Sequence, residues 1–341
     1  MTSLNDALKI IAQNTVLTEE QMVSVMHEIM SGDADSGQIK EFLTHLANRG
    51  ESVSEITGAA RVMREMAATI SSPEFATDCC GTGGDGMNTY NISTAVGFIL
   101  AACGIPVAKH GNRAASSKSG AADTLEALGI HLNVAHEKLE DSLKTLNFCF
   151  LMAPAHHQAM KHVVPIRKEL GTRTIFNLLG PLANPANTKY QLIGVYDKKW
   201  LRPMAEVLHN LGTTKAWLVH GQDGLDEITT TTKTDIVILN NGKITENIIS
   251  PDDFGLNITT PEKLKGGDAE ENAQALLDIY NGEHNAYRDI VLANAAAILM
   301  MHEKVDNLAD GVKMAADVVD SGKAQEVLIR YITFTQNNVE A

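Results

Sequence analysis

The sequence predicts an α/β fold in two parts: a small all-helical domain at residues 1–72 and a larger α/β domain at 73–341, with a mostly parallel central sheet and C-terminal helices. Three observations carry this prediction. Apolar residues recur at helical spacing throughout 1–72. Beyond residues 71–73 (Ser-Ser-Pro), short apolar runs alternate with helical segments, as in parallel βαβ units. The last third of the chain is helical again.

The N-terminal part contains helix-start signals followed by apolar stripes. Thr18-x-x-Gln21 is a capping box. The apolar residues after it follow the i, i+3, i+4, i+7 spacing of a helix face: Met22, Val25, Met26 and Ile29. Ser52-x-x-Glu55 marks a later helix in the same way. These stripes must be buried against the rest of the chain or a second copy. The methionines, continued by Met30, are interpreted as core or dimer interface.

The second part contains five candidate strands, a hairpin and several helices. The strands are expected at 77–80, 106–109, 147–152, 191–196 and 216–220, and the hairpin at 236–248 around Asn240-Asn241-Gly242. Helices are expected at 93–102, 119–128, 137–146, 201–211, 269–280, 286–302 and 308–320, the last ended by Gly322. Proline and glycine interrupt the rhythm after residue 161. A helical segment at 162–188 is expected to return to the first domain.

Composition narrows the classes of function and the cellular location. The net charge of −14 argues against a general nucleic-acid or anionic-membrane surface. The four cysteines, with no C-x-x-C, indicate reduced thiols in a cytoplasmic protein. The N-terminus lacks the pattern of a secretory leader, and no apolar run reaches the ~18 residues of a membrane helix.

The most informative motif is the glycine-rich run 81–86 (GTGGDG), which follows one candidate strand and precedes a hydroxyl-rich helix start. Glycines let backbone N–H groups approach an anion, and a helix N-terminus adds positive potential. Asp85 suits such a site only if it holds a metal's water shell or a ligand hydroxyl. The run matches neither the P-loop nor the dinucleotide fingerprint, and by itself it is equally compatible with a simple turn.

Two more polar loops follow candidate strands. The run 109–113 (KHGNR) with serines at 116, 117 and 119 suits an anionic, polyhydroxylated ligand, or is a polar surface loop with a serine cap. Asp226 and Glu227 suit Mg²⁺ together with substrate phosphates, or are a solvated acidic turn. Because ligands bind at the carboxyl ends of parallel strands, their position favours the ligand interpretations.

A fourth loop holds His156 and His157, whose spacing to His162 is not that of a usual zinc site. Arg167 is suited either to grip a carboxylate or to pair on a helix surface. The sequence contains no serine-triad or zinc-protease motif and no obvious covalent nucleophile. Together, the motifs favour transfer of a phosphorylated group through positioning and electrostatics.

Six segments in the same order resemble the anthranilate phosphoribosyltransferase family of tryptophan biosynthesis. They are 81–86, 91–94, 109–113, 117–123, 167–185 and 220–227, and the likeness runs from about residue 5 to 335. The resemblance implies a homodimer with a helical domain hinged to an α/β domain. It also implies an enzyme that couples anthranilate to 5-phosphoribosyl-1-diphosphate using Mg²⁺.

The resemblance further implies site residues, position by position. The phosphoribosyl diphosphate would be bound by Gly81, Gly83, Gly84, Asp85, Thr89, Asn91, Ser93, Thr94, Lys109, Asn112, Arg113, Ser117, Ser119 and, through its backbone, Ala121. Anthranilate would be bound by Gly81, His110, Asn112, Pro154, His157 and Arg167. Mg²⁺ would be held by Ser93, Asp226 and Glu227.

The chain departs from the family pattern at several positions. Ala121 lacks a hydroxyl, Gln158 stands where proline is usual, Ala115 is small, and His156 replaces a frequent aromatic residue. None of these changes removes a charged or chelating group. The alternatives are a pyrimidine nucleoside phosphorylase, which should not need the Asp226-Glu227 pair, and a non-catalytic nucleic-acid-binding homologue, which the net charge disfavours.

Overall fold

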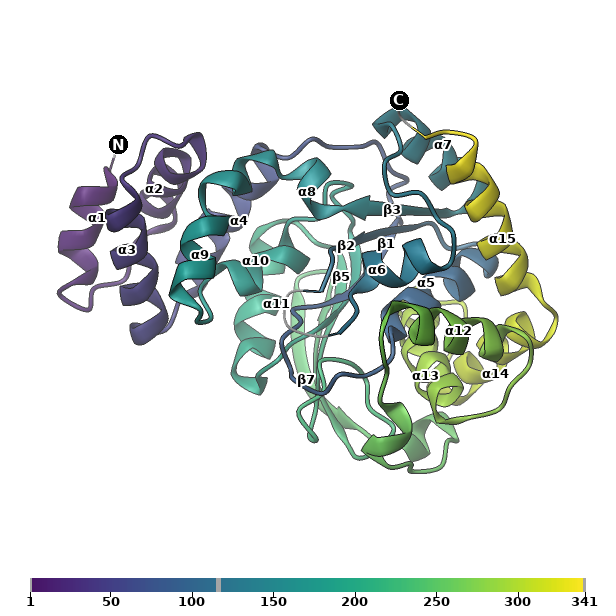
Figure 1. The fold of residues 1–341 in the computed structure, drawn as a ribbon. Helices are drawn as coiled ribbons and strands as arrows, with labels where there is room; N and C mark the ends of the chain where they lie inside the picture. The colour runs from purple at the N-terminus through teal and green to yellow at the C-terminus, as the bar shows by residue number, and fades with distance from the viewer. Residues whose placement is uncertain (1, 115–117, 340–341) are drawn as a thin grey trace.

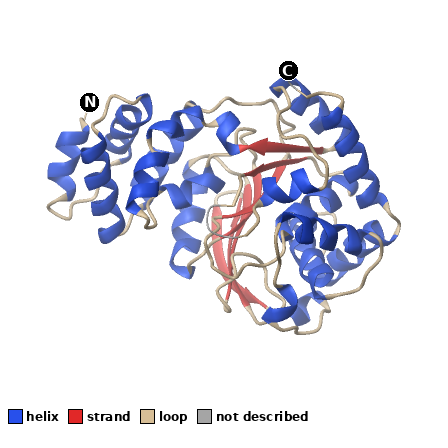
Figure 2. Ribbon diagram, in the orientation of Figure 1, coloured by secondary structure: helices blue, strands red, loops and turns tan. Residues whose placement is uncertain are grey.

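A seven-stranded sheet forms the centre of the molecule (Figures 1 and 2). The computed structural model describes residues 2–114 and 118–339. The strands are β1 (Thr77–Gly81), β2 (Val107–Gly111), β3 (Phe148–Met152), β4 (Tyr190–Gly194), β5 (Lys215–Gly221), β6 (Thr234–Asn240) and β7 (Lys243–Ile249). Each strand falls within a few residues of its predicted position.

The order of the strands is β3-β2-β1-β4-β5-β6-β7. The first five are parallel, and the β6–β7 hairpin is antiparallel. The mostly parallel sheet is therefore confirmed. The chain builds outward from β1 through β2 to β3 and then restarts on the other side with β4. A topological switch point thus lies between β1 and β4, where Gly81 pairs with Gly194, and open α/β sheets bind ligands at such points.

The first four helices form a group at the left of Figure 1, away from the strands. They are α1 (Leu4–Ile11), α2 (Glu19–Ser31), α3 (Ser36–Arg49) and α4 (Val53–Glu65). Of these, α4 joins the group to α10 (Phe176–Leu182) and α11 (Leu201–Asn210). Both predicted capping boxes are present, at Thr18 and Ser52. Met22 and Met26 are fully buried in a core that also contains Leu218 of β5. The apolar stripes are therefore buried against the rest of the same chain.

Two helical layers cover the sheet. On one face, Cys79, Phe148 and Trp217 pack with α5 (Ile92–Ala102) and the C-terminal helices. On the other face, Ile193 and Leu218 share a core with α11 (Leu201–Asn210) and the N-terminal helices. The connections after β2 contain α6 (Ala121–Ala127) and α7 (His136–Leu146). The predicted helix at 119–128 begins two residues late because the chain enters it through extended Gly120.

The segment between β3 and β4 is helical and packs against the N-terminal helices. It contains α8 (Ala153–His156), the 3₁₀ turn η1 (Gln158–His162), α9 (Val164–Leu170) and α10 (Phe176–Leu182). Val163, Ile166, Phe176 and Leu179 lie in the same core as α2, α3 and α4. The residues that come after β3 in the sequence therefore lie next to the N-terminal helices.

The C-terminal part contains one more helix than predicted. The helices are α12 (Ala269–Tyr280), α13 (Ala286–Met301), α14 (Leu308–Asp320) and α15 (Lys323–Gln336), with short 3₁₀ turns η2 (Lys198–Trp200), η3 (Pro251–Phe254) and η4 (Pro261–Leu264) elsewhere. Gly322, with φ of +76°, ends α14 and immediately precedes α15. The buried spacing of Ala324, Leu328 and Tyr331 is helical and identifies the missed element. None of the helices in the described part of the chain has the length and hydropathy needed to cross a bilayer.

Candidate active site

A cavity of about 790 Å³ opens at the carboxyl ends of β1, β2 and β3. Its opposite wall comes from α4, α9 and α10, so the helical part and the sheet enclose it together. It is lined by most of the predicted site residues: Gly81, Gly83, Gly84, Ser93, Lys109, His110, Asn112, Arg113, Ala121, Pro154, His157 and Arg167. Segments that are far apart along the chain thus meet at one site.

The glycine loop is held against the loop that carries the acidic pair. The Gly83 N–H donates to Asp226 Oδ2 over 2.8 Å, and the Asp226 N–H donates to Asp85 Oδ2 over 3.4 Å. A Cβ on Gly81 would overlap the Asp226 carboxylate, and a Cβ on Gly194 would overlap the Asp226 backbone. The glycines that end β1 and β4 are therefore needed to bring Asp226 into the switch point.

Asp226 and Glu227 form a dense negative region with Asp85. Loss of solvation, followed by the charges of Asp85 and Glu227, raises the pKa of Asp226 well above its usual value. Loss of solvation also raises the pKa of Glu227 to about 7, against the attraction of Lys109. A divalent cation would offset both costs, and carboxylate oxygens are the ligands that Mg²⁺ prefers.

The acidic pair does not form a complete protein cage for a metal. Within residues 2–114 and 118–339, no group of three or more His, Cys, Asp or Glu side chains is arranged to hold an ion. This donor set suits Mg²⁺, which commonly uses one or two carboxylates together with substrate phosphates and water. The residues present therefore fit the expected cofactor.

Lys109 and Ser93 line the cavity and also interact with Glu227 of the acidic loop. Lys109 is 1% exposed, and its Nζ donates to the Cys79 carbonyl over 2.7 Å and to Ser93 Oγ over 3.1 Å. Because Glu227 interacts electrostatically with the same lysine, the ammonium partly balances the acidic region. Lys109 thus brings a fixed positive charge to the floor of the cavity.

Several predicted phosphate-site residues lie beside the cavity and do not line it. Asn91 Oδ1 accepts from Asn272 Nδ2 over 3.0 Å and from Thr124, and Thr89 bridges to Lys265. Thr94 is fully buried, and its Oγ1 has no partner in the described part of the chain. Ser119 is buried and bonds Thr124 over 2.9 Å. Ser117 and Ala115 lie outside the described residues.

The loop after β2 has one cation that is already paired. Arg113 donates to Asp123 over 3.1 Å and to both carboxylate oxygens of Glu126. Its backbone N–H donates to Asn112 Oδ1 over 2.8 Å. Any role of Arg113 toward an anion must therefore compete with these two acids.

Two histidines line the cavity as neutral rings. The centroids of His110 and His157 lie 5.3 Å apart, and both side chains are 6% exposed. His110 Nδ1 contacts the Gly180 carbonyl at 3.2 Å, so this nitrogen carries the proton. Burial lowers the pKa of His110 to about 3. Its Nε2 is buried without a partner among the described residues and is available as an acceptor.

His156 has a different environment from its neighbour His157. Its Nδ1 donates to the Ala68 carbonyl over 2.6 Å, its backbone carbonyl accepts from the Ala68 N–H over 2.8 Å, and its ring stacks on His136. It thereby fixes the connection between α4 and β1 instead of lining the cavity.

Arg167 supplies a cation to the wall opposite the sheet. Its guanidinium lies 5.6 Å from the centre of the Phe176 ring, and in the described part of the chain it forms no ion pair. Burial lowers its pKa from the ordinary value, which reflects the cost of holding the charge there without an acid. An anionic group of a ligand would relieve that cost.

Residues that sequence reasoning missed complete the apolar wall of the cavity. Met63, Phe176 and Leu179 come from α4 and α10. The motif at 167–185 identified this segment but assigned no role beyond Arg167. A further missed residue is Asp78, a buried carboxylate that accepts from the His110 N–H over 3.2 Å and from Asn184 Nδ2 over 2.8 Å. It joins β1, β2 and the chain after α10.

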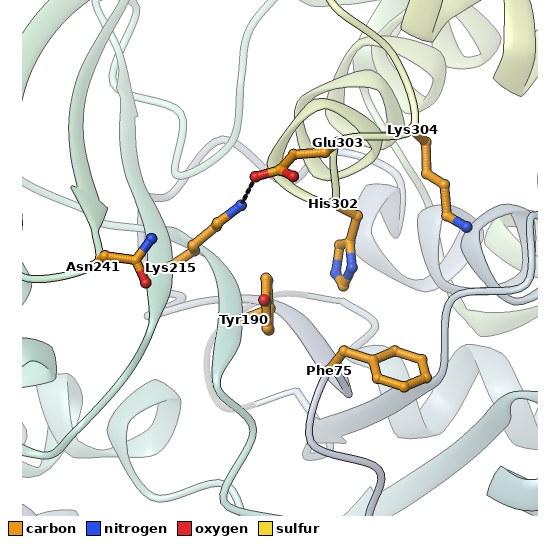
Figure 3. Close-up of a pocket in the computed structure, with 7 residues that line it drawn as sticks. All are labelled: Phe75, Tyr190, Lys215, Asn241, His302, Glu303 and Lys304. Atoms are coloured by element: carbon orange, nitrogen blue, oxygen red, sulfur yellow. Dashed lines mark hydrogen bonds and ion pairs between the residues drawn. The ribbon is translucent and has the colours of Figure 1, made fainter.

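A second cavity, of about 410 Å³, lies at the amino ends of β4 and β5 (Figure 3). There Lys215 Nζ bonds both Glu303, over 2.5 Å, and the Met301 carbonyl, over 3.1 Å. The Tyr190 and His302 rings stack 4.5 Å apart, and His302 Nε2 bonds Thr77. None of the predicted site residues lines this cavity, and its central polar groups already have partners, so the larger cavity is the candidate site.

The family models that match both parts of the chain identify it as a sugar-transferring enzyme. Residues 74–325 match the a/b domain of the Glycosyl transferase family, and residues 5–67 match the helical bundle domain of a glycosyl transferase family.

Relatives place the chain more narrowly. It is 50% identical to an anthranilate phosphoribosyltransferase of Azospirillum brasilense over 99% of this chain and 95% of the relative. The structure of the Thermus thermophilus enzyme of that name superposes with a TM-score of 0.92 at 40% identity, covering 97% of this chain and 99% of the other. The Saccharomyces cerevisiae enzyme, in complex with PRPP and Mg, gives 0.90 at 28% identity with 98% of each chain covered. The chain belongs to the anthranilate phosphoribosyltransferase family.

Proposed function

We propose that this protein transfers the 5-phosphoribosyl group of 5-phosphoribosyl-1-diphosphate to the amine of anthranilate, a step of tryptophan biosynthesis, with Mg²⁺ as cofactor. The observation that carries the proposal is the cavity at the switch point. There a glycine loop, whose Gly83 N–H is bonded to Asp226, and the buried Lys109 stand across from Arg167, which has no acid partner among the described residues. The acidic pair lies behind this loop and does not itself line the cavity. One side suits a metal-bound diphosphate, and the other suits an aromatic carboxylate.

The reaction breaks the bond between the ribose C1 and a diphosphate oxygen, and the electron pair leaves with the diphosphate. A bond forms between C1 and the anthranilate nitrogen, which then loses a proton. The Gly81, Gly83 and Gly84 backbone and Lys109 surround the departing negative charge in this proposal. No covalent enzyme intermediate is needed, which agrees with a site built for positioning.

On the acceptor side, Arg167 is proposed to bind the anthranilate carboxylate, and the ring would lie against Phe176 and Leu179. Asn112, Pro154 and the neutral His110 and His157 line the approach. The aryl amine needs no prior deprotonation. The His110 Nε2, which has no partner among the described residues, is suited to accept a hydrogen bond from it.

Mg²⁺, when bound by Asp226, Glu227 and Ser93, would neutralise the charge that develops on the diphosphate. The chain's own contribution is to hold these ligands through Gly83 and Lys109. The remaining predicted contacts, Asp85, Thr89, Asn91, Thr94, Arg113, Ser117, Ser119 and Ala121, stay part of the proposal.

We also propose the division into a helical domain, 1–72 with 162–188, and a catalytic domain, 73–341. Closure of one on the other would exclude water from the activated sugar. A homodimer through the helical domain is proposed on the resemblance alone, because the methionine stripe lies inside one chain. Sedimentation velocity would test the dimer. The cytoplasmic location expected from the sequence stays a prediction.

The direct test follows the fluorescence of anthranilate during incubation with 5-phosphoribosyl-1-diphosphate, with and without Mg²⁺. The signal should fall only when sugar, enzyme and Mg²⁺ are all present. Unchanged fluorescence under every condition would reject the proposed function.

A further inference from the structure

Arg173 connects the two walls of the cavity. It lies on the short connection, residues 171–175, between α9 and α10, a few residues after Arg167. Its guanidinium Nη2 donates to the Gly84 carbonyl of the glycine loop. The cation therefore comes from the helical segment that holds the acceptor side, and its partner belongs to the loop on the diphosphate side.

The same guanidinium is held from a second direction. It lies 4.0 Å from the centre of the Tyr196 ring, just beyond β4. The Tyr196 N–H donates to Thr82 Oγ1 over 3.0 Å, and the Thr82 N–H donates to the Gly194 carbonyl over 2.9 Å. A planar cation stacked on an aromatic face has a fixed orientation, so its donors point in one direction. Arg173, Tyr196 and Thr82 thus form a chain of contacts around the glycine loop.

The contact acts on a flexible part of the backbone. Gly83 and Gly84 have φ values of +68° and +75°, and glycine resists rotation least. In a planar trans peptide, the carbonyl of Gly84 and the N–H of Asp85 point in opposite directions. Holding the carbonyl therefore sets the direction of the Asp85 N–H, which belongs to the loop proposed to surround the diphosphate.

We propose that Arg173 is a positioning residue that couples the acceptor wall to the glycine loop, so that occupation of one side strengthens binding at the other. The inference rests on the proposed function for the identity of the two ligands. A shift of α9 and its connection relative to the sheet changes the distance from Arg173 to Gly84. The glycine loop is therefore best ordered when α9, which carries Arg167, lies close enough to the sheet for Arg173 to bond Gly84. Coupling between two sites is reciprocal, so each ligand gains affinity by the same factor.

The first test needs no ligand. Hydrogen exchange of the loop amides at 82–90 is compared in the unmodified protein, Arg173→Gln and the control Lys168→Gln. Lys168 is an exposed cation on α9 that forms no hydrogen bond or ion pair with this loop in the described structure, so its removal matches the change in charge. Exchange should rise about threefold or more in Arg173→Gln and stay unchanged in the control. Equal exchange in all three proteins would overturn the proposal.

The second test measures coupling with a pair that cannot react, anthranilate and Mg²⁺-diphosphate. Calorimetry gives the anthranilate Kd with and without saturating Mg²⁺-diphosphate. The ratio should be about fivefold or more in the unmodified protein and fall toward one in Arg173→Gln. Arg173→Lys, which keeps the charge without the planar stack, should lie between them. An unchanged ratio in Arg173→Gln would overturn the role of Arg173, whereas an unmodified protein that binds neither ligand would contradict the proposed function instead.

Discussion

The two ends of the parallel strands differ in how their charged groups are satisfied. At the amino end, Lys215 is partnered by Glu303 and a carbonyl, and the Tyr190–His302 pair is closed by Thr77. At the carboxyl end, Asp226 and Glu227 repel each other, and Arg167 has no acid among the described residues. Both ends contain a cavity and a lysine. The carboxyl end is therefore distinguished as the ligand site by its charges that lack a partner in the described part of the chain, and not by the presence of a cavity. The charges of Lys215 and Glu303 at the amino end are paired within the protein.

The largest effect that tests this contrast concerns the acidic pair. Asp226→Asn with Glu227→Gln should lower kcat/KM by about 10³-fold or more, because the charge that balances Mg²⁺ is lost. The matched control at the amino end is Glu303→Gln, which should leave kcat/KM unchanged. Both are measured by anthranilate fluorescence over a range of Mg²⁺ concentrations. A near-normal rate in the double variant would move the metal site elsewhere.

The next effect concerns the cation on α9. Arg167→Ala should raise the KM for anthranilate by about 30-fold and the KM for the sugar diphosphate by less than about threefold, since only the acceptor loses a charged partner. Lys168→Ala, the neighbouring substitution, should change neither value. Equal increases in both KM values would refute the assignment of Arg167 to the acceptor.

A smaller effect concerns the stability supplied by a buried histidine. Burial lowers the pKa of His156 to about 4 from an ordinary 6.5, so the unfolded chain binds its proton first as the pH falls. The contribution of the buried neutral ring to the free energy of unfolding is therefore fully present above about pH 6.5 and is lost as the pH falls toward 4. Between pH 7 and 5 the loss should reach about 1–2 kcal/mol. Urea unfolding at the two pH values should therefore show a smaller pH dependence in His156→Gln, and identical slopes would exclude this role.

The smallest effect belongs to the satisfied cluster. Lys215→Met should lower the free energy of unfolding by about 1 kcal/mol, because the Met301 carbonyl and Glu303 lose their donor. Catalysis should be unaffected, in contrast to Lys109→Met at the other end of the sheet. Urea unfolding and turnover are measured on the same preparations. A loss of turnover in Lys215→Met would break the distinction between the two ends.

The sequence predicted most of the fold because local signals and the tertiary structure agree. The capping boxes at Thr18 and Ser52 and the turn at Asn241-Gly242 each have a physical cause within a few residues. It missed α15 because Gly322 was interpreted as an end, although its left-handed conformation ends one helix directly before another begins.

The sequence predicted which residues the structure brings to the carboxyl edge of the sheet where they lie in a strand, as Gly81 and Lys109 do, or in the loop that follows one, as Asp226 does. The surroundings of each side chain, such as its burial and its ion pairs, were less predictable. The sequence could not show that Thr94 lies fully buried, that Arg113 is paired with Asp123 and Glu126, or that Met63 lines the cavity. These outcomes depend on contacts between segments distant in the chain.

The close approach of Asp226 to Gly81 and Gly194 has a consequence for the unfolded chain. The acidic loop reaches its place only when β1, β4 and β5 are paired in the sheet. An unfolded chain lacks this arrangement, so a ligand that requires it binds only the native form. Mg²⁺ with diphosphate should therefore shift the folding equilibrium by mass action, by about 2.7 kcal/mol at a hundredfold excess over its Kd. The resistance of the protein to heat or to proteolysis would then depend on how much Mg²⁺ and diphosphate are present.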